Sequence, residues 1–85
     1  MIIRTTPKFE KKYKKLPDNI KNKAKERELI FRENPFNPKL RTHKLSGKDQ
    51  NSWSFYVDYS IRIKFIFLSN KEVLFLDIGL HNIYK

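Results

Sequence analysis

Apolar and polar residues alternate in two stretches of the last third of the chain, and this alternation predicts a β-hairpin. In the stretch 61–67, every second residue is large and apolar, and Arg62 and Lys64 fall between them. A period of two sends the two sets to opposite faces of a strand. The stretch 73–81 alternates in the same way. Its expected apolar face carries Leu74, Leu76, Ile78 and Leu80, and its expected polar face carries Phe75, Asp77 and His81.

The register of this hairpin decides which side chains meet. A turn at 69–70 pairs Arg62 with Asp77, so that a cross-strand ion pair is one expected use of the arginine. A slip by one residue would turn a whole strand over. In every register that keeps the apolar faces together, Arg62 and His81 therefore share the polar face.

The first half of the chain has the longer apolar period of helices. After a strand candidate at 2–5, Thr6 and the proline that follows it predict the start of a helix over 7–16. Asp18 is expected to cap a second helix over 19–33. The residues expected to face inward are Phe9, Tyr13 and Leu16 in the first helix and Ile20, Ala24, Ile30 and Phe31 in the second.

A helical hairpin followed by strands predicts the fold class. Prolines in 34–38 end the second helix, the basic segment 39–45 follows and is expected to be partly extended, and a strand over 53–57 precedes the hairpin. The element order is β-α-α-β-β-β, which indicates an α+β protein. We expect the N-terminal strand and the αα-hairpin to pack on one face of a twisted antiparallel sheet, within a single domain over 1–85. The other sheet face is left open.

The charge of the chain points to a polyanionic partner. Its 85 residues include 19 Lys and Arg against 9 Asp and Glu, which gives a net charge of +10. Over so small a surface, this field favours a nucleic acid or an acidic protein. The charge alone does not choose between the two.

Metals, cofactors and membranes are not expected. Cysteine is absent and only 2 histidines are present, which leaves no ligand set for a structural zinc ion. No apolar stretch approaches the ~20 residues that span a bilayer, and the N-terminus lacks the features of a signal peptide. We expect a cytoplasmic protein that uses no metal and no cofactor.

The open face of the predicted sheet carries the candidate chemistry. Arg62 offers a planar fork that binds phosphate oxygens, and His81 offers an imidazole, whose ordinary pKa of ~6.5 suits proton transfer at neutral pH. Lys64 is expected on the same face. Tyr56 is either a base-stacking side chain or part of the peripheral core. Further candidates for contact with RNA phosphates are Lys39, Arg41, Lys44 and Lys48.

The element order and four stretches of sequence together carry a family resemblance. The stretches are His43-Lys44-Leu45-Ser46-Gly47, Trp53-Ser54-Phe55, Tyr59-Ser60-Ile61-Arg62-Ile63 and Leu76-Asp77-Ile78-Gly79-Leu80-His81-Asn82-Ile83-Tyr84. They resemble the RelE/ParE superfamily of toxins from type II toxin-antitoxin systems. The nearest likeness is to its RelE and YafQ-like ribonuclease branch.

This resemblance implies an endoribonuclease that cleaves mRNA, with the ribosome as the expected site of action, and that uses no metal. In such enzymes the ribose 2′-hydroxyl attacks the adjacent phosphorus and the 5′-oxygen leaves. The implied roles are charge stabilisation by Arg62, proton transfer by His81, a second proton-transfer or phosphate-binding role for His43, and orientation of the RNA by Tyr84. The implied partners are mRNA, the ribosome and an acidic antitoxin that forms a hetero-oligomer with the toxin.

The end of the chain departs from the family pattern. Leu80 precedes His81 where members usually have Thr or another small residue, and Tyr84 follows His81 one residue earlier than usual. Two alternatives therefore stay open beside the ribonuclease. One is a ParE-like inhibitor of DNA gyrase, and the other is a member that has lost catalysis and keeps only antitoxin or RNA binding.

Overall fold

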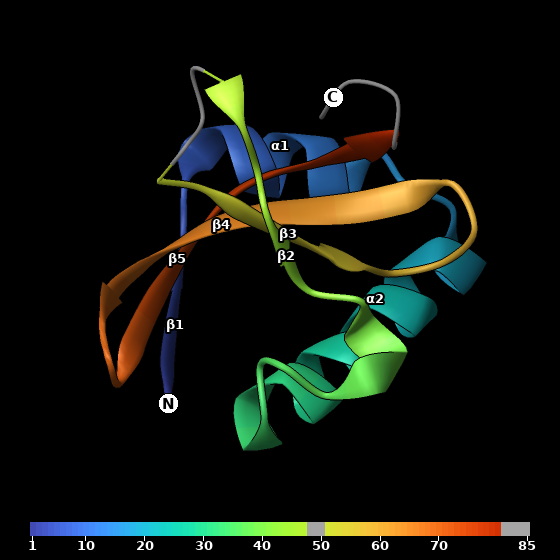
Figure 1. The fold of residues 1–85 in the computed structure, drawn as a ribbon. Helices are drawn as coiled ribbons and strands as arrows, with labels where there is room; N and C mark the ends of the chain where they lie inside the picture. Colours follow the sequence, from blue (N-terminus) through green and yellow to red (C-terminus); the bar gives the residue numbers. More distant parts are fainter. Residues whose placement is uncertain (48–50, 81–85) are drawn as a thin grey trace.

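A five-stranded sheet carries helices on one face (Figure 1). The structure is a computed structural model, and it describes residues 1–47 and 51–80. Its elements in chain order are β1 (Ile2–Thr5), α1 (Pro7–Lys14), α2 (Asp18–Glu33), the 3-10 helix η1 (Pro38–Leu40), β2 (His43–Lys44), β3 (Trp53–Tyr56), β4 (Ile61–Ser69) and β5 (Glu72–Leu80).

The strands lie in the order β1-β5-β4-β3-β2. The N-terminal strand β1 joins the sheet at one edge and runs parallel to β5, whereas all other neighbours are antiparallel. The sheet is therefore mixed. The predicted α+β class is confirmed, and the basic segment adds the short strand β2 at the other edge.

Local sequence sets the starts of both helices. Thr6 caps α1 as predicted, because its Oγ1 accepts a hydrogen bond from the backbone N–H of Phe9 at 3.1 Å and Pro7 follows it. The predicted cap of α2 is wrong, since Pro17 occupies the N-cap position and Asp18 is the first helical residue. The carboxylate of Asp18 still lies in the first turn, where the helix dipole favours a negative charge.

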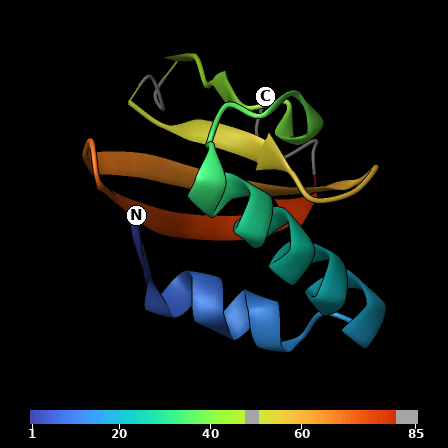
Figure 2. The same ribbon diagram turned by 90° about the horizontal axis from the view of Figure 1, so that it is seen from below.

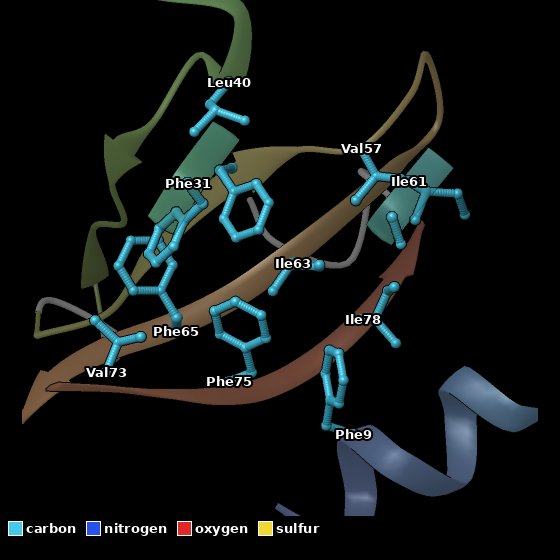
Figure 3. Close-up of a cluster of buried hydrophobic side chains, with 12 residues drawn as sticks. Phe9, Phe31, Leu40, Val57, Ile61, Ile63, Phe65, Val73, Phe75 and Ile78 are labelled. Atoms are coloured by element: carbon cyan, nitrogen blue, oxygen red, sulfur yellow. The ribbon is translucent and has the colours of Figure 1, made fainter. Parts of the chain in front are cut away.

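Phenylalanine rings from both helices and from three strands fill the space between the layers (Figure 3). Phe31 of α2 is fully buried, and its ring centroid lies 4.8 Å from that of Phe55, 5.0 Å from that of Phe65 and 5.6 Å from that of Phe75. Phe9 of α1 joins the cluster 5.5 Å from Phe75. Figure 2 shows α1 running alongside β5 while α2 crosses the sheet obliquely. Both helices thus bury their apolar stripe on one sheet face.

The predicted hairpin forms, but its register differs from the prediction. The turn lies at 70–71, one residue later than expected, so Arg62 pairs with Gly79 and not with Asp77. The expected ion pair between Arg62 and Asp77 is therefore wrong. The carboxylate of Asp77 instead contacts Nζ of Lys12 in α1 at 2.7 Å.

Shifts of register within the hairpin explain which residues of β5 enter the core. Phe75 lies in the core at 2% exposure, so the expectation that Leu74 and Leu76 face inward and Phe75 faces outward is wrong. One shift falls between the pairs formed by Phe75 and Asp77. Because a shift by one residue exchanges the two faces of a strand, Ile78 beyond it is buried as predicted.

Candidate functional site

Strand register brings polar residues of three strands onto one face of the sheet. His43 of β2 pairs with Ser54 of β3, which in turn pairs with Lys64 of β4. Two residues further along, Tyr56 of β3 pairs with Arg62 of β4. Directly paired residues, and residues two positions apart on one strand, point to the same side. We call these five residues the open face, which is opposite to the face that the helices cover.

His43 is oriented by contacts of both its ring nitrogens. Its Nδ1 lies 3.1 Å from the carbonyl oxygen of Arg41, and its Nε2 lies 3.4 Å from Oγ of Ser54. A carbonyl oxygen only accepts hydrogen bonds, so we assign the proton of the neutral ring to Nδ1. Ser54 is 1% exposed, and its hydroxyl donates toward the lone pair on Nε2. Both ring nitrogens of His43 are therefore engaged, Nδ1 as a donor to Arg41 and Nε2 as an acceptor from Ser54.

Backbone carbonyls of the turn between β3 and β4 fix the guanidinium group of Arg62. Its Nη1 donates to the carbonyl oxygen of Asp58 at 2.8 Å and lies 3.2 Å from that of Ile61. The carboxylate of Asp58 accepts from the backbone N–H groups of Ser60 and Ile61 at 3.0 and 2.9 Å, which stabilises the same turn. In the described part of the chain, these hydrogen bonds of Arg62 use Nη1, which leaves Nε and Nη2 for an anion.

Tyr56 lies among three arginines that come from different elements. The Cζ of Arg62 is 4.7 Å from the centroid of the tyrosine ring, that of Arg41 is 5.2 Å away and that of Arg27 is 5.6 Å away. Arg27 belongs to α2, and its Nε donates to the carbonyl oxygen of Val57 at 3.2 Å. Aromatic faces attract guanidinium groups. The guanidinium groups of the three arginines therefore lie close together around the ring of Tyr56.

An open groove of about 590 Å³ extends from Tyr56 toward α2 and η1. Arg41 follows η1 with a left-handed φ of 50°, and its backbone N–H donates to the carbonyl oxygen of Pro38 at 3.3 Å. Two residues that the sequence marked for contact with RNA, Lys39 and Arg41, are thus brought to one groove. Its lining residues are Glu26, Arg27, Pro38, Lys39, Arg41 and Tyr56.

The other predicted site residues lie elsewhere. Lys44 pairs with Trp53, one position out of phase with His43, and therefore does not share the open face. It lines a second hollow, of about 430 Å³, together with Asn51, Trp53, Ile66 and Phe67. Three predicted residues lie outside the described residues, and their roles stay predictions: Lys48, His81 and Tyr84.

Asp77, which pairs with Lys64 of β4, has its carboxylate in contact with α1. Its carboxylate lies 2.7 Å from Nζ of Lys12 and 3.4 Å from Nζ of Lys8, and it accepts from the backbone N–H of Ile78 at 2.9 Å. Burial alone raises the pKa of Asp77, but the hydrogen bond and charge of Lys12, the charge of Lys8 and the Ile78 hydrogen bond together hold it below its ordinary value. Asp77 is therefore ionised at neutral pH.

Two contributors were missed from the sequence: Arg27, and Ser54 as the partner of His43. Arg27 lies three residues after Ala24 and four before Phe31, both of which are buried, so it belongs to the inward stripe of α2. The position of Arg27 among apolar, inward-facing residues could have marked it as a candidate, because a charged side chain in such a position needs a hydrogen-bonding or ionic partner. Ser54 gave no such signal, since small polar residues are common on strands that face water.

Residues 1–47 and 51–80 contain neither a candidate metal site nor a helix that could span a membrane. No group of three or more His, Cys, Asp or Glu side chains in these ranges could hold a metal ion. None of the helices in these ranges is long and apolar enough to cross a membrane.

Comparison with solved structures identifies the class of fold. The arrangement of helices and strands is the fold seen in solved structures of YoeB/ParE and YafQ toxins, which is the fold that the resemblance implied. The chain is similar to the YoeB/ParE toxin from Agrobacterium tumefaciens, with a TM-score of 0.80 and 15% identity over 95% of this chain and 99% of that one.

Two further structures come from Escherichia coli. YafQ from E. coli strain BL21(DE3) has a TM-score of 0.77 and 20% identity, over 95% of this chain and 93% of that one. The E. coli DinJ-YafQ toxin-antitoxin complex gives 0.74 and 22%, over 95% and 92%. The sequence matches no family model and no curated protein. At these identities, the likeness establishes the fold.

Proposed function

We propose that the protein is the toxin of a type II toxin-antitoxin system and acts as a metal-independent endoribonuclease on mRNA at the ribosome. The observation that carries this proposal is the open face, where Arg62 and His43 stand on the same side of a sheet whose fold is shared with toxins. An arginine fork and an imidazole are side chains suited to phosphodiester cleavage, because one stabilises phosphate charge and the other transfers protons.

The proposed reaction uses the RNA itself as the nucleophile. A general base removes the proton of a ribose 2′-hydroxyl, and the oxygen attacks the adjacent phosphorus. The bond from phosphorus to the 5′-oxygen breaks, and that oxygen receives a proton from a general acid. The products are one end with a 2′,3′-cyclic phosphate and one with a 5′-hydroxyl.

Each predicted site residue has a role in this reaction. Arg62 stabilises the negative charge that develops on the phosphate, through N–H groups that the turn does not use. His81 acts as general acid or base, and His43 is the second proton-transfer or phosphate-binding group. Tyr84 orients the RNA. Contacts with RNA phosphates are proposed for Lys39, Arg41, Lys44, Lys48 and Lys64.

An acidic antitoxin is the second proposed partner. The net charge of +10 favours association with a protein of opposite charge. Among the structures of the same fold, YafQ is found in a complex with DinJ. We infer that this chain also forms a toxin-antitoxin hetero-oligomer, in which it is held inactive.

The proposed activity is tested by adding the purified protein to translating ribosomes. The wild-type protein should cut the mRNA, and Arg62→Ala and His81→Ala should each slow cleavage about 10²-fold or more. Lys71→Ala is the matched control, because it removes a charge at the turn between β4 and β5 and should cut like wild type. If the mRNA stays intact in the presence of the wild-type protein, the proposed endoribonuclease activity is contradicted.

Assays of gyrase inhibition and of RNA and antitoxin binding, run beside the cleavage assay, separate the alternative functions. A ParE-like inhibitor of DNA gyrase is favoured by the likeness to the YoeB/ParE toxin, and it would need no proton-transfer group. Gyrase inhibition without mRNA cleavage would select it. RNA or antitoxin binding with no cleavage, unchanged in His81→Ala, would instead select a member that has lost catalysis.

A further inference from the structure

We propose that the groove beside Tyr56 is a subsite for the phosphate backbone of single-stranded RNA and that Arg27 is one of its ligands. The subsite rests on the proposed function, because it takes a flanking phosphate of the same RNA whose scissile phosphate lies at Arg62. The open face and the groove share Tyr56, so a strand can pass from one to the other.

The convergence of three guanidinium groups is the first observation behind this subsite. Arg27, Arg41 and Arg62 all approach the ring of Tyr56, with Cζ atoms between 4.7 and 5.6 Å from its centroid. In the described part of the chain, none of them forms an ion pair with a carboxylate. Like charges so arranged repel one another, and an anion placed among them relieves the repulsion. One carboxylate, Glu26, also lines the groove, but Arg27, Arg41 and Lys39 outnumber it, so the lining carries a net positive charge that favours a phosphate.

The second observation is that backbone carbonyls hold the guanidinium groups of two of the arginines, Arg27 and Arg62. Arg27 is anchored through Nε to the carbonyl oxygen of Val57, and Arg62 through Nη1 to that of Asp58. Arg41 is placed by a left-handed backbone conformation directly after η1. Donors that are already oriented lose less conformational freedom when a ligand binds.

The size of the groove favours a polymer over a small anion. It is open and has a volume of about 590 Å³, much larger than one phosphate group, and Lys39 adds a further cation to its lining. An RNA strand that binds there exchanges its counterions for the protein's cations. A free phosphate ion would occupy only part of it.

Tyr56 acts here as a positioning residue. Its ring is a surface for the guanidinium groups of Arg27, Arg41 and Arg62, rather than a free platform for a base. Tyr56→Phe keeps that surface and should bind RNA like wild type. Tyr56→Leu removes it and should weaken binding as much as Arg27→Ala does. Equal binding by Tyr56→Leu and wild type would overturn this role.

The subsite is tested with a single-stranded RNA carrying 2′-O-methyl groups, which binds but cannot undergo attack by its own 2′-hydroxyls. Arg27→Ala should weaken binding about 10-fold and reduce the slope of log affinity against log salt by about 0.7, the share of one phosphate contact on a single strand. Arg27→Lys keeps the charge and should keep the slope. Wild-type affinity and slope in Arg27→Ala would overturn the subsite.

Lys25→Ala is the matched control, because it removes one charge from the same helix at an exposed position that lines the hollow between α1 and α2. Its affinity and slope should match those of wild type. A loss equal to that of Arg27→Ala would show that only the total charge matters, which contradicts the subsite. Arg27→Gln replaces Arg27→Ala if thermal unfolding shows that the alanine variant is not folded.

Cleavage of mRNA separates this inference from the proposed function. If the wild-type protein cuts no mRNA but the RNA-binding slope falls in Arg27→Ala, the proposed function fails and the subsite stands. If the wild-type protein cuts mRNA and Arg27→Ala binds and cuts equally well, the subsite fails and the proposed function stands.

Discussion

At the scale of single residues, Arg62 and His43 are held by different means. The guanidinium of Arg62 is fixed by carbonyl oxygens of the turn that precedes it, whereas the imidazole of His43 is fixed between the carbonyl of Arg41 and the hydroxyl of Ser54. In the described part of the chain, the hydrogen bonds of Arg62 use only Nη1, whereas those of His43 engage both ring nitrogens. Such support is what keeps a catalytic group oriented before the substrate binds.

Replacement of His43 tests its proposed role in proton transfer. His43→Ala should lower the single-turnover rate of mRNA cleavage about 10²-fold to 10⁴-fold. Ser54→Ala removes only the hydroxyl that faces Nε2, so its loss should be smaller, about 10-fold or less. A wild-type rate in His43→Ala would exclude His43 from proton transfer, with Lys71→Ala as the control for a surface change.

Individual residues also show how far the sequence could predict the site. Alternation placed Tyr56, Arg62 and Lys64 together, because a strand with one buried face fixes where its other side chains point. His43 required the family resemblance, since it stands in a segment without a clear period. Arg27 could not be placed from the sequence alone, because its neighbour Tyr56 is distant in the chain and only packing brings them together.

At the scale of elements, a buried carboxylate joins α1 to β5. Asp77 contacts Lys12 and Lys8 of α1 close to a shift in the register of the hairpin. The sequence located the hairpin because its apolar residues had to share a face. It could not locate the register shifts, since these depend on how Phe75 packs against Phe9 and Phe31. The turn at 70–71 has no glycine to mark it.

The contact between Asp77 and α1 predicts a dependence of stability on pH. The pKa of Asp77 is lower in the folded protein than its ordinary value, so its contribution is present above that value and is lost as the pH falls through the folded pKa. The free energy of unfolding, measured with urea from pH 7 down to pH 2, should therefore fall more in wild type than in Asp77→Asn. At neutral pH, Asp77→Asn should cost about 1–2 kcal/mol.

Glu72→Gln is the control for this prediction. Glu72 forms an ion pair with Arg4, whose side chain is 62% exposed, so the substitution should cost less than about 1 kcal/mol. If the unfolding free energies of wild type and Asp77→Asn have the same pH dependence, the lysines of α1 do not stabilise the carboxylate.

The packing of α2 on the sheet predicts a large effect of one ring. Phe31 is fully buried against three other phenylalanines, so Phe31→Ala should reduce the free energy of unfolding by about 3–5 kcal/mol. Phe36 is 52% exposed, and Phe36→Ala should cost less than about 2 kcal/mol. Urea unfolding checks both values, and equal losses would contradict this description of the core.

At the scale of the whole molecule, Arg and Lys side chains lie on and beside the open face of the sheet. The two helices carry many more Lys and Arg residues. The net charge of +10 predicts that RNA binding weakens steeply as salt is added. The fold, shared with YoeB/ParE and YafQ, places the core on one side of the sheet and polar residues on the other. This division explains how so small a chain can combine a buried core with a polar surface on the same sheet.

The ends of the RNA fragments test the proposed function most directly. mRNA cut by the wild-type protein on translating ribosomes should carry a 2′,3′-cyclic phosphate at one end and a 5′-hydroxyl at the other, because the 2′-hydroxyl is the proposed nucleophile. A single 2′-O-methyl group at the cut position should block cleavage there. Fragments with 5′-phosphate ends, or cleavage that persists beside the methyl group, would contradict the account.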